Sequence, residues 1–147
     1  MNAPAIVLPE NQQEAEICYR KPLNAVIEVT NLRLRTFIGF NEEERTKQQD
    51  IIINAEIHYP LNHGCLDDVV DDALNYKTIT KSIIKYVESG RFLLLERLVA
   101  DVLTICCEHP TVTYAKVKID KPHALRFADS VSLSLDYHRE NVKETSQ

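Results

Sequence analysis

The order of the hydrophobic periods along this chain limits the fold to one class. Apolar and polar residues alternate through two early and two late stretches, whereas two stretches between them repeat their apolar residues every three to four positions. Alternation is typical of a strand with one buried face, and the longer period is typical of an amphipathic helix. We therefore expect strands at about 25–38, 51–59, 114–121 and 130–138, and helices at about 75–90 and 94–108.

The first expected strand changes face partway along its length. Its apolar residues hold one parity in 25–29 and the other parity in 32–38. An extra residue in one strand reverses the side on which the following side chains lie. The sequence therefore predicts a bulge or break at Thr30-Asn31.

Two strands, two helices and two further strands indicate an α+β domain. Its helices would cover one face of a four-stranded antiparallel sheet. Such a sheet has two open edges, and long edge strands pair readily with another chain. We therefore expect a homo-oligomer.

The length of 147 residues allows one domain with a substantial core. Residues 1–23 mix prolines, glutamines and glutamates without a sustained period, so we expect a flexible extension there. We place the single domain at 24–139 and expect a frayed polar tail at 140–147.

Charge and cysteine spacing exclude several classes of function. The formal net charge of −5 argues against a general nucleic-acid binder. The sequence shows no run of membrane-spanning length and no secretory signal pattern, so we expect no membrane partner and a cytoplasmic protein. The cysteines have no CxxC spacing, so we interpret them as reduced packing thiols and expect no metal. They are Cys18, Cys65, Cys106 and Cys107.

Lys121 ends the third expected strand on its apolar face. It continues the parity of Ala115, Val117 and Ile119, and Pro122 stops the pairing directly after it. An amine beside apolar surface is partly desolvated, which favours its neutral form and suits it to proton transfer. The alternative is a lysine that bends away to solvent.

Three further residues are candidates for a site. Glu96 lies in the first turn of the second expected helix, where its two oxygens could accept hydrogen bonds from a flat ligand with adjacent N–H groups. It could instead complement the helix dipole at the surface. Tyr76, near the start of the first expected helix, could offer its hydroxyl to a site or its ring to the core. Glu44 is either a site carboxylate or one solvated charge of the run Glu42-Glu43-Glu44.

Five cationic residues are candidates for binding an anion. Arg33 and Arg35 share the polar face of the first expected strand and form a positive stripe that could meet a polyphosphate. A solvated strand face explains the stripe equally well. The other cations are Lys77, His123 and Arg126. The sequence contains no phosphate loop, nucleophile elbow, zinc-protease motif or dinucleotide fingerprint.

Six segments of the chain resemble the dihydroneopterin aldolase family, and more closely its epimerase branch. They follow the family order over about 26–138 without a large insertion. The segments are LRLRTFIG at 32–39, DIIIN at 50–54, DALNY at 72–76, RFLLLE at 91–96, KIDKPHALR at 118–126 and ADSVS at 128–132.

The resemblance implies the tunnelling fold, in which ββααββ subunits join their sheets into an oligomeric barrel. Subunits of this family form tetrameric rings that commonly stack as an octamer, with a pterin substrate bound between neighbouring subunits. This arrangement agrees with the open sheet edges expected above.

The resemblance also implies roles for individual residues. Lys121 would be the general acid and base, assisted by Tyr76, and Glu96 would hold the amino group and ring amide of the pterin. Glu42 and Glu43 stay open as alternatives to Glu44. The implied catalytic residues are Lys121, Tyr76 and Glu44, and the implied substrate-binding residues are Glu96, Leu95, Leu74, His123, Arg33, Arg35 and Arg126.

The implied reaction needs no cofactor, because the C=N bond of a dihydropterin can accept electrons as a side-chain carbon–carbon bond breaks. Aldolases release 6-hydroxymethyl-dihydropterin and glycolaldehyde, whereas the epimerase branch recombines the fragments and inverts the 2′ carbon of dihydroneopterin triphosphate to give dihydromonapterin triphosphate. We expect the epimerase, since the cations could hold a triphosphate tail and tethering favours recombination. An aldolase and a non-catalytic pterin-binding protein are the alternatives.

Overall fold

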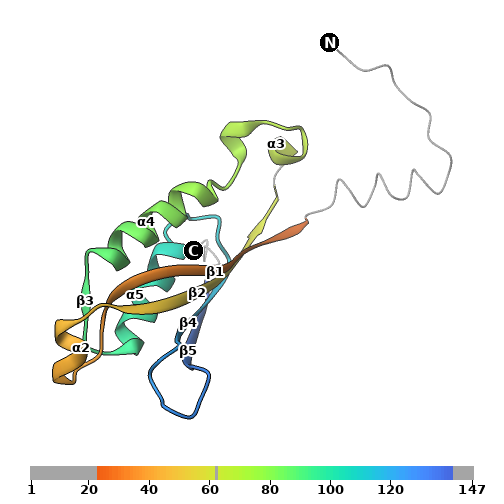
Figure 1. Ribbon diagram of the computed structural model, residues 1–147. Coiled ribbons are helices and arrows are strands. Elements are labelled where there is room, and N and C mark those ends of the chain that lie inside the picture. Colours follow the sequence, from red (N-terminus) through yellow and green to blue (C-terminus); the bar gives the residue numbers. More distant parts are fainter. Residues whose placement is uncertain (1–22, 62, 141–147) are drawn as a thin grey trace, which may run out of the picture.

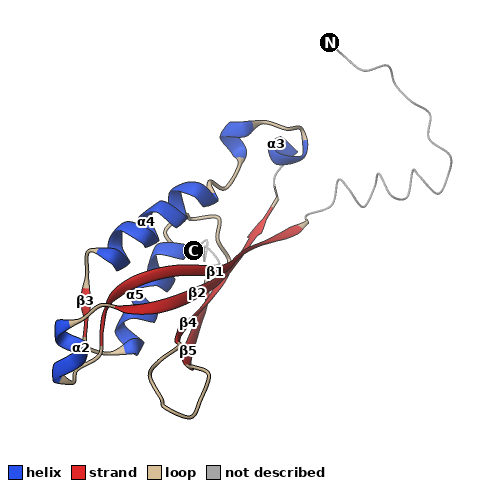
Figure 2. Ribbon diagram, viewed as in Figure 1, coloured by secondary structure: helices blue, strands red, loops and turns tan. Residues whose placement is uncertain are grey.

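The computed structural model describes residues 23–61 and 63–140. The expected extension and tail lie almost entirely outside these residues, and so does Cys18. The described chain forms one twisted sheet with its two long helices on the same side, and a loop between the last two strands projects from one end (Figures 1 and 2).

The sheet has five strands in the order β3-β1-β2-β4-β5. They are β1 (Asn24–Ile38), β2 (Gln49–Pro60), β3 (Arg91–Phe92), β4 (Tyr114–Lys121) and β5 (Val131–His138). The four long strands pair antiparallel as predicted. The expectation of four strands was wrong by one, because β3 is a two-residue strand that pairs parallel with the end of β1. Two residues are too few to show a hydrophobic period.

The predicted break in the first strand is confirmed. The register between β1 and β2 shifts between Val29 and Leu32, and Asn31 has a φ of 54°. The backbone N–H of Asn31 donates to Oδ1 of Asn54 on β2 at 2.9 Å. This side chain replaces the backbone partner that Asn31 lacks at the break. After the break, Leu34 and Ile38 turn toward the core.

Two amphipathic helices, α4 (Tyr76–Glu88) and α5 (Leu95–Cys106), cover the apolar face of the sheet. Asn75 caps α4, since its side chain accepts a hydrogen bond from the N–H of Thr78 at 3.2 Å. The fully buried side chains come from both helices and from alternate positions of the strands, so one core lies between the layers. The largest of them are Ile38, Ile51, Ile53, Ile57, Ile83, Leu98 and Ile119.

A buried hydroxyl joins the end of α4 to the sheet. Thr36 of β1 is fully buried, and its Oγ1 donates to the carbonyl oxygen of Val87 at 2.6 Å. The C-terminal end of α4 therefore lies beside the same end of the sheet as Gln49, which pairs with Thr36.

Short helices occupy two of the connections between the long elements. The loop after β1 contains α2 (Glu42–Thr46), and the connection after β2 contains α3 (His63–Leu66) and a 3-10 turn at Val70–Asp72. Such short helices carry too few apolar residues for a periodic signal.

Within the described residues, no helix is long and apolar enough to cross a membrane, and no group of three or more potential ligands is placed to hold a metal ion. Cys106 and Cys107 form no disulfide within the described part of the chain. Burial raises the pKa of the Cys106 thiol to about 12.

Candidate active site

The last residue of β4 and the middle of α2 form an ion pair at one end of the sheet. Nζ of Lys121 lies 2.8 Å from Oε2 of Glu44. The two side chains are 13% and 21% exposed, so the pair is largely shielded from solvent. The lysine therefore does not bend away into solvent.

The backbone at the start of α2 brings Glu44 to this place. Asn41 caps the helix, and its Oδ1 accepts a hydrogen bond from the N–H of Glu44 at 2.8 Å. Gly39 has a φ of 122°, which side chains other than glycine rarely adopt. A Cβ at Gly39 would lie 2.1 Å from the carboxyl carbon of Glu44, so the carboxylate occupies the space that a side chain would fill.

Gln49 holds the other side of the carboxylate. Its Nε2 donates to Oε2 of Glu44 at 3.1 Å and to the carbonyl oxygen of Ile38 at 2.6 Å. Gln49 thus links the end of β1 to the ion pair. The sequence analysis did not identify this residue, because a glutamine five positions after an acidic run carries no pattern that marks it.

The neighbours of Glu44 stabilise its charged form. The hydrogen bond from Lys121 is the main cause that lowers the pKa of this carboxyl group. The Gln49 amide and the backbone N–H of Asn41 act in the same direction, whereas partial burial opposes them. Near neutral pH Glu44 is therefore a carboxylate hydrogen-bonded to an amine. Such a pair can donate a proton and accept one at adjacent positions.

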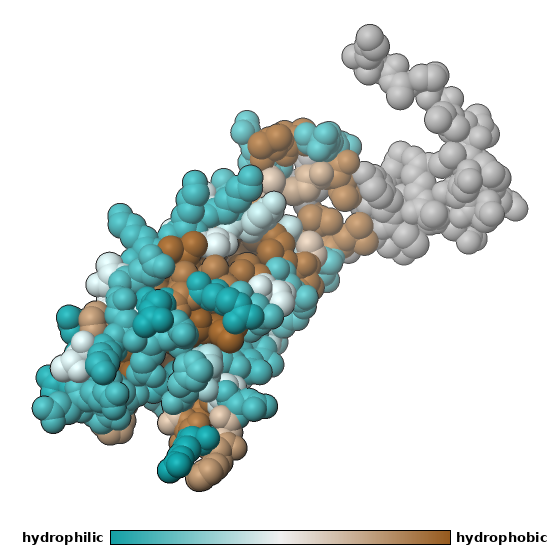
Figure 3. Space-filling model, in the orientation of Figure 1, coloured by the Kyte–Doolittle hydropathy of each residue, from teal (hydrophilic) through white to brown (hydrophobic). Residues whose placement is uncertain are grey.

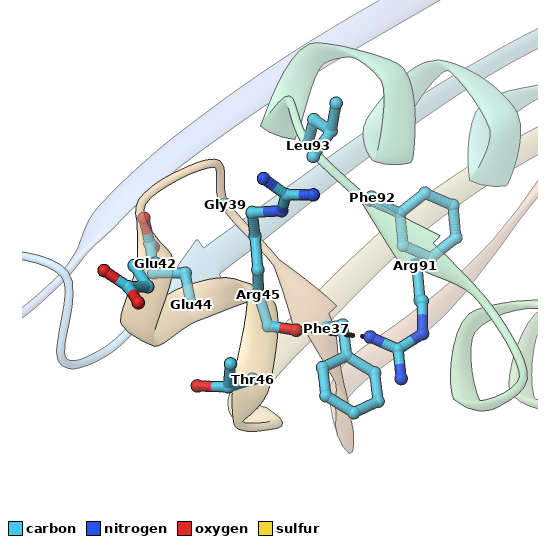
Figure 4. A pocket seen from close by; sticks show the side chains of 9 residues that line it. All are labelled: Phe37, Gly39, Glu42, Glu44, Arg45, Thr46, Arg91, Phe92 and Leu93. Carbon is cyan, nitrogen blue, oxygen red and sulfur yellow. Dashed lines mark hydrogen bonds between the residues drawn. The ribbon is translucent and has the colours of Figure 1, made fainter.

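A cavity of about 760 Å³ opens directly beside Glu44. Figure 4 shows Arg91 lying against Phe37, with its guanidinium 3.9 Å from the ring centre and a hydrogen bond of 3.2 Å to the carbonyl oxygen of Arg45. Phe92 and Leu93 add apolar surface to the wall. The sequence analysis missed both arginines as candidates.

Tyr76 and Leu74 lie at the opposite end of the molecule from the ion pair. They line a different cavity, where Tyr76 is 51% exposed and Leu74 is buried. The other end of α4 lies beside Thr36, and the rise of about 1.5 Å per residue separates Tyr76 from Glu88 by about 18 Å along the helix. One chain therefore does not bring Tyr76 to Lys121.

Helix α5 begins with Leu95 and Glu96. They follow Leu93, which lines the cavity beside Glu44, by two and three residues. Glu96 is exposed, and Leu95 packs partly against the core. Among the described residues, no hydrogen bond or ion pair joins Glu96 to Lys121 or Glu44. The carboxylate is free to meet a ligand or another subunit.

Three of the predicted cations converge and two do not. Arg33, Arg35 and His123 line a common cavity of about 430 Å³. Arg126 lies elsewhere on the projecting loop, with its guanidinium 5.5 Å from the ring centre of Phe127. Lys77 is exposed on the first turn of α4.

Comparison with known proteins identifies close relatives. The family model described as FolB, dihydroneopterin aldolase, matches residues 27–136. A protein of Escherichia coli named dihydroneopterin triphosphate 2′-epimerase is 57% identical over 115 residues, which cover 78% of this chain and 96% of the relative. A protein of the same name from Pseudomonas aeruginosa is 52% identical over 119 residues, which cover 81% of this chain and 97% of the relative.

Aldolases are more distant in sequence but share the fold. The dihydroneopterin aldolase of Escherichia coli is 26% identical over 121 residues, which cover 82% of this chain and 98% of that protein. Its crystal structure in complex with neopterin superposes with a TM-score of 0.72 at 25% identity, covering 77% of this chain and 98% of that chain. A guanine-bound dihydroneopterin aldolase from Burkholderia thailendensis gives a TM-score of 0.67 at 20% identity, covering 80% of this chain and 93% of that chain, which shows the fold alone. With the family match over most of the sequence and the same fold around the Lys121–Glu44 pair, this chain belongs to the dihydroneopterin aldolase family.

Proposed function

We propose that the protein is a dihydroneopterin triphosphate 2′-epimerase. The observation that carries this proposal is the shielded ion pair of Lys121 and Glu44 at the end of the sheet. Proteins named as this epimerase are identical to the chain at more than half of the aligned positions. This identity supports the epimerase over the other activities of the family. The product would be dihydromonapterin triphosphate.

The proposed reaction is a reversible retro-aldol cleavage. The 2′ hydroxyl loses its proton, the bond between C1′ and C2′ breaks, and its electron pair moves toward the ring C=N bond, whose nitrogen takes up a proton. The 2′ carbon becomes an aldehyde, turns over and recombines with the ring fragment through the opposite face. Lys121 exchanges the protons as general acid and base, and Glu44 accepts the hydrogen bond of the side-chain hydroxyl.

We assign pterin binding to the start of α5. The Glu96 carboxylate is exposed there, and its two oxygens suit the adjacent amino and ring N–H groups of a pterin. Leu95 beside it, together with Leu74, would contact the flat faces of the ring system. For the loop carboxylate near the substrate side chain we propose Glu44 in preference to Glu42 and Glu43, and its hydrogen bond with Lys121 supports this choice.

A complete site would require a second copy of the chain. Tyr76 and Leu74 lie about 18 Å along α4 from the end that carries the ion pair, so we propose that they serve the site of a neighbouring subunit. The outer edge of β5 has no partner strand among the described residues, and most of β1 is likewise free on the side away from β2. These edges would join subunits into a tetrameric ring and a closed barrel, and two rings would stack as an octamer.

The family match at 27–136 supports 24–139 as one catalytic domain. The free thiols at Cys106 and Cys107 suit a reducing compartment, and we propose the cytoplasm.

One assay separates the candidate functions. The purified protein would be incubated with dihydroneopterin triphosphate and with dihydroneopterin, and the pterin stereoisomers and the free aldehyde would be quantified over time. Inverted pterin in excess over aldehyde supports the epimerase. Stoichiometric release of the aldehyde would make the protein an aldolase, the activity named for the more distant relatives. Binding without any turnover would make it a non-catalytic pterin-binding protein.

A further inference from the structure

The cavity that gathers three predicted cations includes in its wall a sequence neighbour of each of two residues that contact Glu44. Pro122, the residue after Lys121, forms part of its wall, and so does Asp50, the residue after Gln49. The lysine and the glutamine that hold Glu44 are thus each covalently next to this cavity. Successive residues of a strand point to opposite faces of the sheet, so the cavity lies at the same end of the sheet as the ion pair but on the side that carries Arg33 and Arg35.

Arg35 is fixed in orientation by two protein contacts. Its Nη1 donates to Oδ1 of Asp50 at 2.8 Å, and its Nη2 donates to the carbonyl oxygen of Gln48 at 3.1 Å. A guanidinium has five N–H groups, so donors remain after these two bonds. Arg35 is therefore an oriented donor whose charge is largely matched by Asp50.

Arg33, unlike Arg35, is not held in place by protein hydrogen bonds among the described residues. It lies on the same face of β1, where Ile52 is its cross-strand neighbour. Among the residues that the structure describes, its guanidinium has no hydrogen-bond or ion-pair partner. A guanidinium without a protein partner, beside one that is held in place, can present pairs of N–H groups to phosphate oxygens.

The charged side chains in the cavity wall balance formally, so the wall offers directed donors without a net positive charge. The wall includes the carboxylates of Asp50 and Glu88, which formally balance Arg33 and Arg35. Asp50 is hydrogen-bonded to Arg35, whereas Glu88 also lines the cavity, has no hydrogen-bond or ion-pair partner among the described side chains, and would repel an anion. His123 supplies a third donor from the loop after β4.

We propose that this cavity is the polyphosphate subsite, with Arg33 as the principal donor, Arg35 as the oriented second donor and His123 as the donor from the loop. The inference rests on the proposed function and deepens it. Cleavage between C1′ and C2′ leaves the triphosphate on the aldehyde fragment. A protein that holds the phosphates therefore keeps this fragment in place while it turns over, which favours recombination over release.

The test compares Arg33→Ala with the unchanged protein on two substrates. Loss of a charge-assisted hydrogen bond predicts a KM for dihydroneopterin triphosphate that rises about tenfold to a hundredfold. The KM for unphosphorylated dihydroneopterin should not change. The ratio of free aldehyde triphosphate to epimer should rise as well, because the untethered fragment escapes. Equal losses for both substrates, or no loss for the triphosphate, would overturn the proposal.

Two companion variants sharpen the result. Glu88→Gln removes the repelling carboxylate and should lower the KM for the triphosphate, a gain that general damage to the fold cannot produce. Lys116→Ala removes a cation from the same polar sheet face but opposite Glu56, outside the cavity, and should leave both KM values unchanged. An increased KM in Glu88→Gln would contradict the subsite.

A binding measurement separates this inference from the proposed function. Inorganic tripolyphosphate would be titrated into the wild-type protein and into Arg33→Ala by calorimetry, with the thermal melting of both recorded to verify folding. Binding by the wild type that Arg33→Ala loses supports the subsite even if neither pterin is turned over. Identical binding by both proteins, or none by the wild type, would refute it.

Discussion

The amine of Lys121 lies 2.8 Å from the carboxylate of Glu44, although 77 positions of sequence separate them. Lys121 ends a central strand, and Glu44 lies in a five-residue helix whose cap and preceding glycine fix its direction. Lys121 is therefore held by the sheet, whereas Glu44 is held by the local geometry of a turn and a short helix. This difference in support determines which substitutions should affect chemistry and which should affect folding.

Lys121→Ala should abolish turnover and preserve pterin binding. General acid–base groups contribute about 10²–10⁴-fold to rate, so kcat should fall by that order while ligand affinity stays within a small factor. Stopped-flow turnover and fluorescence titration with a pterin would measure the two effects. The matched control is Lys118→Ala, three positions earlier on the other face of β4, which should keep full activity. Unimpaired turnover in Lys121→Ala would remove the lysine from the mechanism.

Gly39→Ala should cost both stability and activity. The new Cβ would lie 2.1 Å from the Glu44 carboxyl carbon, and the φ of 122° is strained for alanine. We expect a loss of about 1–3 kcal/mol in the free energy of unfolding, measured by denaturant titration.

A double variant tests the cause of that loss. Gly39→Ala combined with Glu44→Ala removes the clashing carboxylate, so it should lose less stability than the sum of the two single variants. Simple additivity would mean that backbone strain alone, and not the carboxylate, requires the glycine.

The ion pair should make stability depend on pH in the acid range. The pKa of Glu44 is lowered in the folded protein, chiefly by the hydrogen bond from Lys121, so the folded state favours the carboxylate. The resulting stabilisation is fully present above the unfolded value of about 4.5 and is lost as the pH falls through the lower folded pKa.

Glu44→Gln provides the comparison, because it keeps the shape and removes the titrating group. The stability advantage of the wild type over this variant should be constant near neutral pH and should shrink below about pH 4.5. Denaturant unfolding at a series of pH values measures it. An advantage that persists unchanged in acid would show that Glu44 does not stabilise the fold through its charge.

Mixed oligomers should recover activity if sites take Lys121 and Tyr76 from different chains. Lys121→Ala and Tyr76→Phe would each be inactive or strongly impaired alone. After co-refolding in equal amounts, about a quarter of the sites at such an interface would combine two unmodified residues. A mixture no more active than its parents, in oligomers verified by native mass spectrometry, would place both residues in sites of a single chain.

Hydrophobic period alone located the four long strands, the break at Thr30-Asn31 and both long helices. These features follow from burial of one face, which repeats along many residues and is therefore visible in a single sequence. The pattern could not show β3, because two residues carry no period. It also could not show α2, whose side chains are not buried.

The exposed apolar residues are a second feature that the sequence pattern could not predict. Figure 3 shows brown apolar side chains in the middle of one face and at the segment between β2 and α4, and mixed brown and teal atoms on the projecting β4–β5 loop. On that loop Leu125 is 57% exposed and Phe127 is 95% exposed. Composition gives no indication of which apolar residues stay outside the core of a single chain.

By itself the sequence determined the α+β order of elements and the placement of Lys121 on the apolar face of its strand, because both depend on neighbours within a few residues. Only the tertiary structure showed that Glu44 contacts Lys121, that Gln49 supports the carboxylate, and that Arg126 lies apart from Arg33 and His123. These relationships depend on which distant backbone segments the shared core brings to the same end of the sheet. A contact between residues 77 positions apart is set by that packing, and no local pattern records it.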